Sequence, residues 1–243
     1  MGKIEKLYHH EESVHNYKAA RVILPIIQHL VSPNSVLDVG CGIGTWLKVV
    51  QELGLIDFFG VDGEYVDRTL LRKFIDEINF KSVDLRMPLD LDRKFDLAIC
   101  LEVAEHLPLD SADVLIDSLC KHSKTILFSA AIPFQGGQNH LNEQSPSYWI
   151  EKFEQRGYQV YDPIRSVVWE RKDVDVWYKQ NMLLFSTIEF NLSRPTFTHI
   201  VHPELFEAHL IKKIQYMNEL EKIKNGEVSS SFYLKNLIKS IFR

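Results

Sequence analysis

The stretch Val36-Leu37-Asp38-Val39-Gly40-Cys41-Gly42-Ile43-Gly44-Thr45-Trp46 decides the fold of this chain. Its apolar beginning predicts a short buried strand, and the apolar spacing of residues 46–53 predicts a helix directly after it. Glycines tolerate unusual backbone angles and carry no Cβ, so the three alternate glycines would let backbone N–H groups at the helix start approach a ligand. A dinucleotide fingerprint has the spacing G-x-G-x-x-G, whereas this loop has Gly44 followed by Thr45. Asp38 adds a carboxylate that suits a cationic amine better than a pyrophosphate.

Strands and helices are expected to alternate after this loop. Apolar runs predict strands at residues 58–62, 79–83, 95–101, 124–129, 158–161 and 182–188, and helices at 111–122 and from Ser145-Pro146 to Gly157. Alternation of this kind is typical of a parallel sheet with crossover helices. Ligands of such sheets bind beyond the carboxyl ends of the strands.

The glycine loop and the strand ends after it resemble the class I S-adenosylmethionine-dependent methyltransferases, over about residues 8–190. The resemblance implies an α/β, Rossmann-like sandwich with a mostly parallel seven-stranded sheet whose last strand is antiparallel. It also implies S-adenosyl-L-methionine as cofactor, with Asp62 on the ribose hydroxyls, Asp84 near the adenine amine and Leu85 against the ring. The full set of expected cofactor residues is Asp38, Gly40, Gly42, Gly44, Trp46, Asp62, Asp84, Leu85, Leu101 and Glu102.

The polar loop at residues 133–144 should lie at the same edge of the sheet and face the methyl acceptor. His140 is the candidate general base and Glu143 the group that orients it, while His106 is the rival base. The alternative is that His140 caps the following helix or binds backbone. The candidate substrate-binding residues are Gln138, Asn139, Asn142, Trp177, Tyr178 and His15, although the rings near Trp177 could instead pack an edge hairpin.

The runs HLNEQSPSYWIEKFEQRGY and VWYKQNMLLF resemble a methyltransferase subgroup associated with bacterial sugar, surface-polysaccharide and capsule biosynthesis. That resemblance implies O-methylation of a hydroxyl on a sugar, a nucleotide-linked sugar or a similar polar small molecule. Two alternatives stay open. The chain could methylate a nitrogen or carboxyl group of another metabolite, or it could be a noncatalytic S-adenosylmethionine-binding partner subunit.

We expect a catalytic domain at residues 1–190 and a helical C-terminal extension at 191–243. Residues 1–34 would form a helical lid or flank, with helical spacing from Ser13 to Leu30 broken at Pro25. A long helix should run from Pro203 to Asn225, and its apolar stripe would pack against the core or form the seam of a homodimer. Residues 232–243 carry three basic side chains and no acids, which leaves membrane-surface contact as a weaker alternative to docking on protein.

Composition narrows the partners. The chain has 243 residues, a formal charge of −5 and a pI near 6.1, which disfavours a nucleic-acid partner. No apolar stretch is long enough to span a bilayer. The polar first residues lack the apolar run of a signal peptide, so we expect a cytoplasmic protein. We expect three reduced cysteines and no metal site, because strand-like residues separate His199 from His202.

Overall fold

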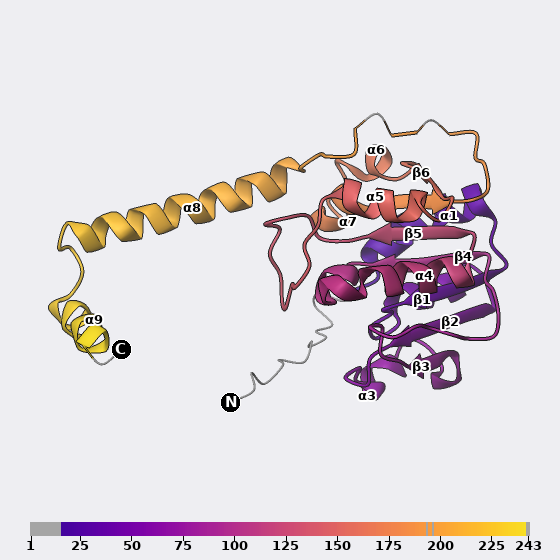
Figure 1. Cartoon of the computed structure of the whole chain (residues 1–243), viewed down its shortest axis with the longest axis horizontal. Coiled ribbons are helices and arrows are strands. Elements are labelled where there is room, and N and C mark those ends of the chain that lie inside the picture. The colour runs from indigo at the N-terminus through magenta and orange to yellow at the C-terminus, as the bar shows by residue number, and fades with distance from the viewer. Residues whose placement is uncertain (1–15, 193, 196, 242–243) are drawn as a thin grey trace. The chain divides into compact units, whose positions relative to one another are not determined.

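The computed structural model describes residues 16–192, 194–195 and 197–241, and the chain divides into two compact units. The first unit extends to Ile200, and the second is Val201–Arg243. Figure 1 shows the elements along the chain. The functional division that the sequence predicts, a catalytic domain followed by a helical extension, stays a prediction.

The first unit contains a seven-stranded sheet with the strand order β3-β2-β1-β4-β5-β7-β6. Pairing is parallel from β3 through β5, whereas β7 is antiparallel to both β5 and β6. The predicted sandwich with an antiparallel last strand is therefore confirmed. The strands are β1 (Ser35–Val39), β2 (Asp57–Asp62), β3 (Phe80–Ser82), β4 (Leu97–Leu101), β5 (Thr125–Ser129), β6 (Gln159–Tyr161) and β7 (Leu183–Ser186).

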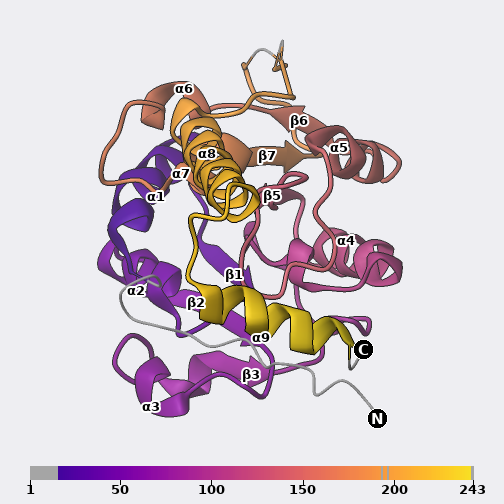
Figure 2. The ribbon, with the colours of Figure 1, turned by 90° about the vertical axis from the view of Figure 1, so that its left-hand side faces the viewer.

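Helices cover both faces of this sheet. Figure 2 shows α1 (Lys18–Val31) and α2 (Thr45–Glu52) on one side, and α4 (Ala112–His122) and α5 (Pro146–Glu154) on the other. Each face has its own apolar cluster, because β1 and β4 alternate side chains between the two faces. Short elements complete the unit: α3 (Arg68–Leu71), α6 (Arg165–Val168), α7 (Val176–Asn181) and the 3-10 turns η1 (Glu77–Asn79), η2 (Ala104–His106) and η3 (Leu109–Ser111).

The prediction that Pro25 breaks the first helix is wrong. The helix α1 runs through Pro25 to Val31. Proline removes one backbone hydrogen bond and crowds the preceding turn. Leu24 and Ile27 beside it are buried in the core, however, and Pro25 itself is exposed, so the packing of the helix outweighs the local cost. Residues 13–15 lie outside the described part of the chain.

β6 and β7 form the antiparallel edge pair, and residues 165–181 form the connection between them. They fold into α6 and α7 before β7 begins. Arg165 is buried, and its guanidinium donates to Asp162 and to the carbonyls of Phe197 and Thr198. This side chain therefore fastens the segment after β7 to the start of α6.

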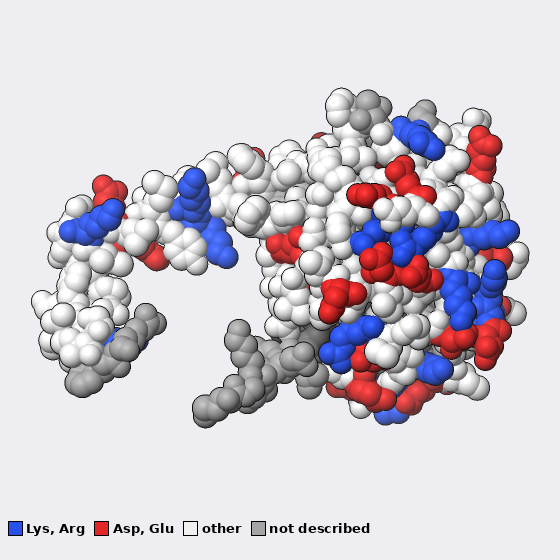
Figure 3. All heavy atoms as spheres, in the orientation of Figure 1, with Lys and Arg blue, Asp and Glu red and all other residues white. Residues whose placement is uncertain are grey.

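Opposite charges are mixed on the face that carries α4 and α5 (Figure 3). Lys152 and Arg156 pair with Asp113 at 2.8 and 3.0 Å, and Arg156 also pairs with Asp117 at 2.6 Å. The acid partners are exposed, so each pair contributes at most about 1 kcal/mol. The pairs fix the register of the two helices more than they add stability.

The second unit consists of α8 (Pro203–Lys224) and α9 (Ser230–Ile241). His202 caps α8, since its Nδ1 accepts a hydrogen bond from the N–H of Glu204 at 3.3 Å. The hydroxyl of Tyr233 on α9 donates to the carbonyl of Ile223. The apolar stripe of α8 is not buried by its own unit; its exposed members are Phe206, Leu210, Ile214, Met217 and Leu220.

Two further sequence-based predictions concern the whole chain. No helix in the described ranges is both long and apolar enough to cross a membrane. Cys41, Cys100 and Cys120 are unpaired thiols, as the sequence predicts.

Candidate active site at the carboxyl edge of the sheet

The glycine loop leaves β1 in a backbone conformation that suits glycine. Gly40 has a φ of 79°, and a Cβ built on it would lie 2.3 Å from Cγ2 of Val103. Gly42 and Gly44 also have positive φ, at 55° and 85°. Gly44 begins α2 without a side-chain cap, so the first N–H groups of that helix stay available to a ligand.

Asp38 and Asp62 are buried carboxylates on the adjacent strands β1 and β2. Oδ2 of Asp38 has no hydrogen-bond partner in the described structure. Burial, with a further contribution from the charge of Asp62, raises the pKa of Asp38 to about 8. Asp62 is well bonded: Oδ2 accepts from the N–H of Gly42 at 2.6 Å, and Oδ1 accepts from the hydroxyl of Tyr65 at 2.7 Å. The site therefore holds one orphaned carboxylate oxygen beside the loop.

Asp84 lies two residues past the end of β3, as predicted, but its carboxylate is exposed and bound by Arg86 at 2.9 Å. The hydrogen bond from the Arg86 side chain holds the pKa of Asp84 below its ordinary value. Leu85 beside it is buried. An adenine amine would therefore meet a carboxylate that already has a cationic partner, and the role of Asp84 stays a prediction.

Trp46 at the start of α2 contacts Tyr178 of α7. Their rings form a T-shaped pair with centroids 5.3 Å apart, and Trp177 packs edge-on against Tyr178 at 6.0 Å. Trp46 is 7% exposed. The α7 segment that the sequence suggested as a substrate wall thus packs directly against the helix that follows the glycine loop.

Glu102 directly follows Leu101, the last residue of β4, in the left-handed region, with a φ of 54°. Its carboxylate accepts hydrogen bonds from Gln135 at 3.1 Å and from Asn181 at 3.1 Å, and Asn181 also donates to Gln135 at 2.9 Å. Burial raises the pKa of Glu102 despite these bonds. A non-glycine residue in this conformation costs on the order of 1–3 kcal/mol and is typical of functional sites. Glu102 thereby links three segments, which are the end of β4, the loop after β5, and the helix α7.

Glu105 is fully buried in η2, where its carboxylate meets the side chain of Glu102 and no hydrogen bond of good geometry reaches either oxygen among the described residues. Burial and the nearby charge of Glu102 raise its pKa well above the usual range. The ring of His106 meets the ring of His140 edge to face, with centroids 4.9 Å apart. The backbone carbonyl of Glu105 accepts from the N–H groups of Leu141 and Asn142 at 2.7 and 3.0 Å, which ties the loop after β5 to η2.

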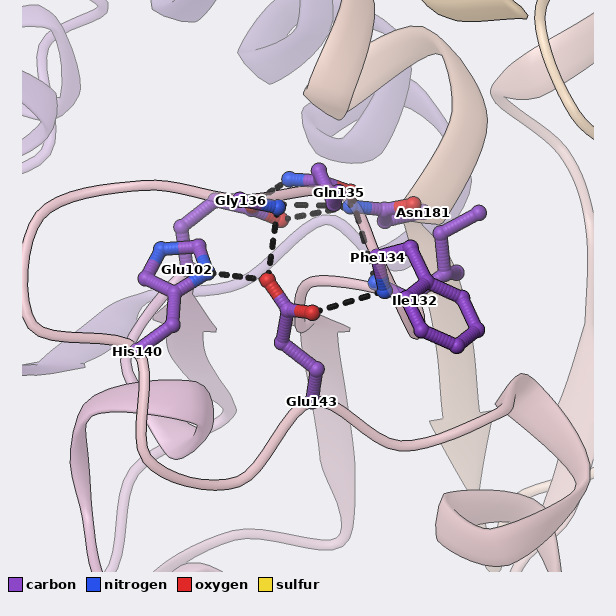
Figure 4. Close-up of polar contacts among 8 residues, drawn as sticks. All are labelled: Glu102, Ile132, Phe134, Gln135, Gly136, His140, Glu143 and Asn181. Carbon is purple, nitrogen blue, oxygen red and sulfur yellow. Dashed lines mark hydrogen bonds and ion pairs between the residues drawn. The ribbon is translucent and has the colours of Figure 1, made fainter. Parts of the chain in front are cut away.

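Glu143 organises this loop (Figure 4). Its Oε1 lies 2.8 Å from Nδ1 of His140 and 2.7 Å from the N–H of Gly136, while Oε2 accepts from the N–H of Phe134 at 2.7 Å. Burial alone would raise the pKa of Glu143, but the bonds from His140, Gly136 and Phe134 lower it. An ionised Glu143 accepts a hydrogen bond from the Nδ1–H group of His140. Nε2 is then the ring nitrogen that carries a free lone pair.

The remaining substrate candidates are placed less uniformly. Gln138 is exposed and Asn139 half-buried, whereas Asn142 is 3% exposed and accepts a hydrogen bond from Gln144. His15 lies outside the described residues.

Three polar residues of the site were missing from the sequence prediction: Glu105, Gln135 and Asn181. Glu105 stands one position before the candidate His106, but nothing local indicates that it is buried. The contacts of Gln135 and Asn181 with Glu102 join residues 33 and 79 positions apart, so spacing along the chain gives no sign of them.

Comparisons with known proteins agree with this architecture. A model of a methyltransferase domain matches residues 8–165. The sugar N-methyltransferase of a Streptoalloteichus species has a TM-score of 0.57 at 12% identity, with 78% of this chain and 99% of that chain covered. The S-adenosylmethionine-bound amino pentose methyltransferase of Micromonospora echinaspora has a TM-score of 0.54 at 14% identity, covering 76% and 99%. The magnesium protoporphyrin IX methyltransferase of Synechocystis, also with bound cofactor, has a TM-score of 0.50 at 18% identity, covering 69% and 76%. No curated protein sequence matches the chain.

Proposed function

The chain belongs to the methyltransferase domain family of class I S-adenosylmethionine-dependent enzymes, and we propose that it methylates a hydroxyl of a sugar or similar polar small molecule. The proposed acceptors include nucleotide-linked sugars, and we propose that the reaction belongs to surface-polysaccharide biosynthesis. The observation that carries the proposal is the bonded pair of His140 and Glu143, at the same edge of the sheet as the glycine loop.

The described residues fit the cofactor. Oδ2 of Asp38 is a buried carboxylate oxygen without a partner, which is what the cationic amine of an amino acid would neutralise. The loop at Gly40 leaves no room for a side chain, so backbone N–H groups rather than Cβ atoms line it. Asp62 would hold the ribose, where its hydroxyls would take the place of the Tyr65 hydroxyl.

The bound cofactor supplies an activated methyl group on a sulfonium, and the chain's own residues align the acceptor and remove its proton. Nε2 of His140 is the atom that accepts this proton. Glu143 holds the imidazole through Nδ1 and stabilises the cation that forms. His106, in edge-on contact with His140, positions that ring. Positioning and proton removal are the main contributions a protein makes to such a displacement.

A carbohydrate acceptor is supported by two features. The loop around His140 is rich in amide side chains that can bond several hydroxyls, namely Gln138, Asn139 and Asn142. Two of the structural neighbours act on sugars, although at 12% and 14% identity they show a common fold rather than a common substrate. Those two carry out methylation of amino sugars, so an amine is the acceptor that competes most directly with a hydroxyl.

The test is incubation with cofactor carrying a labelled methyl group and a panel of neutral, amino and acidic nucleotide-linked sugars, followed by mass spectrometry of the products. We expect label on an oxygen of a neutral sugar, located by fragmentation. Label on nitrogen or on a carboxylate would overturn the hydroxyl assignment. Binding of S-adenosylhomocysteine without any labelled product would favour a noncatalytic partner subunit.

A further inference from the structure

The proposed reaction, in which His140 takes the acceptor proton, does not use Glu105. Its carboxylate is fully buried against the side chain of Glu102, and no hydrogen bond of good geometry reaches either oxygen in the part of the chain that is described. Leaving a buried polar group unbonded costs roughly 1–3 kcal/mol, and more when the group is charged. A bound cation would offset this cost for the buried carboxylate of Glu105.

Two imidazoles stand beside this carboxylate. One ligand atom from each of Glu105, His106 and His140 lies within 4.8 Å of the other two, the one such grouping among the described residues. A divalent ion that bonds its ligands at about 2.0–2.3 Å holds neighbouring ligand atoms about 3–4 Å apart. A small inward movement of the side chains is therefore enough to enclose an ion.

The surrounding structure prepares these groups for a cation. The bond from Nδ1 of His140 to Glu143 leaves Nε2 free to bind, in the way that a carboxylate commonly orients a metal-bound imidazole. Gly137 lies against this edge of the ring and carries no Cβ, which would be 2.2 Å from Nε2, so no side chain of residue 137 covers that nitrogen. The backbone bonds from Leu141 and Asn142 to the carbonyl of Glu105 hold the two segments together without using the side chains.

We propose that Glu105, His106 and His140 bind a divalent cation of the Mn²⁺ or Zn²⁺ type. One carboxylate and two imidazoles form a mixed oxygen and nitrogen donor set that suits such ions better than Ca²⁺. Three protein ligands leave coordination positions open for an acceptor hydroxyl, whose pKa the cation would lower so that its proton passes to solvent water. In the metal-bound protein His140 is a ligand rather than the base, and the methyl group would still be transferred to the same oxygen. The sequence predicts no metal site, and this inference replaces that prediction.

The test uses the full chain, treated with chelator and then titrated with Mn²⁺ without cofactor or acceptor. Electron paramagnetic resonance of free Mn²⁺ counts the bound ions, and calorimetry with Zn²⁺ repeats the measurement. We expect one ion per chain. Glu105→Gln should weaken binding at least about 100-fold, and Glu143→Gln, which acts through His140, about 10- to 100-fold. The matched controls Glu154→Gln and His29→Ala, both at exposed helix positions, should bind as the unmodified protein does.

A second measurement guards against variants that fail to fold. Saturating metal should raise the melting temperature of the unmodified protein and leave that of Glu105→Gln unchanged. Absence of a stoichiometric ion, or equal affinity in Glu105→Gln and Glu154→Gln, would overturn the inference. These outcomes are separate from the proposed function. Chelator-insensitive methylation of a sugar hydroxyl would remove the metal role and keep the reaction, whereas metal binding without any sugar product would do the reverse.

Discussion

The carboxyl of Asp38 on β1 lies beside the carboxylate of Asp62 on β2, and burial together with that neighbouring charge raises the pKa of Asp38 to about 8. Asp62 is held by the N–H of Gly42 and the hydroxyl of Tyr65, whereas Oδ2 of Asp38 has no partner in the described structure. Asp38 therefore keeps its proton up to neutral pH. Its titration affects both the stability of the free protein and its response to a cationic ligand.

The stability of the free protein should fall as Asp38 ionises. Its pKa is 3.8 in the unfolded chain and about 8 in the folded protein, so its stabilising contribution is complete below pH 3.8 and is lost as the pH rises to about 8. For each pH unit between these two pKa values, the free energy of unfolding changes by about 1.4 kcal/mol. Asp38→Asn should therefore gain several kcal/mol of unfolding free energy relative to the unmodified protein between pH 5 and 8, measured by urea unfolding.

Asp173→Asn is the control for that measurement. Asp173 is exposed and its pKa is lowered by Arg171, so its titration is complete below pH 5. It should leave the pH slope unchanged over the same interval. Parallel slopes for the unmodified protein and Asp38→Asn would show that Asp38 is already ionised at neutral pH.

Binding of S-adenosylhomocysteine should become tighter between pH 6 and 8. The cationic amine of the ligand favours ionised Asp38, which must first lose its proton, so affinity should rise up to about tenfold per pH unit. Calorimetry in buffers of different ionisation enthalpy should detect proton release on binding. Asp38→Asn should bind more weakly at pH 8 and show no such slope.

Asp62→Ala should also weaken S-adenosylhomocysteine binding, through the lost ribose contact. Because it removes the charge that helps to raise the pKa of Asp38, the pH-dependent rise should move to lower pH. Tyr65→Phe removes the hydroxyl that the ribose would displace from Oδ1 of Asp62, so this variant should not weaken binding. Unchanged affinity in both aspartate variants would remove the proposed orientation of the cofactor.

Substitution of Gly40 should reveal how tightly the glycine loop is packed against the segment after β4. Gly40→Ala combines a positive φ with a contact of 2.3 Å to Val103, whereas Gly54→Ala has a positive φ and no neighbour within 4 Å. Both should lose about 1–2 kcal/mol through the backbone, and Gly40→Ala about 1–3 kcal/mol more through overpacking. Thermal unfolding of both variants measures the difference.

The double variant Gly40→Ala with Val103→Ala isolates the contact. It should recover the overpacking part of the loss, after correction for Val103→Ala alone, but not the backbone part. Equal melting temperatures for Gly40→Ala and Gly54→Ala would mean that the loop moves freely away from Val103.

The sheet and the glycine loop were predictable because their signals are local: apolar runs, strand-end acids and glycine spacing all lie within a few residues of the structure they specify. Pro25 was misjudged for the opposite reason, since the burial of Leu24 and Ile27 comes from packing that no local pattern contains. The burial of Glu105 depends on a loop that returns 36 and 37 positions later, at residues 141 and 142. At Asp84 the strand end predicts where the carboxylate lies but not its ion pair with Arg86 two positions away, and its cofactor role stays a prediction.

Substitutions at His140 and Glu143 should separate the chemistry of the loop from its structure. His140→Ala should retain affinity for S-adenosylhomocysteine and lose methyl transfer by about 10²- to 10⁴-fold, because the loop faces the acceptor. Glu143 accepts from two backbone N–H groups as well as from His140, so its loss affects more than the orientation of the imidazole. Glutamine offers one acceptor oxygen in place of two, so Glu143→Gln should slow transfer and also destabilise the loop, detected as faster amide exchange at Phe134 and Gly136. His29→Ala is the control for loss of a histidine elsewhere. Transfer at the unmodified rate in His140→Ala would end its assignment in both the metal-free and the metal-bound protein.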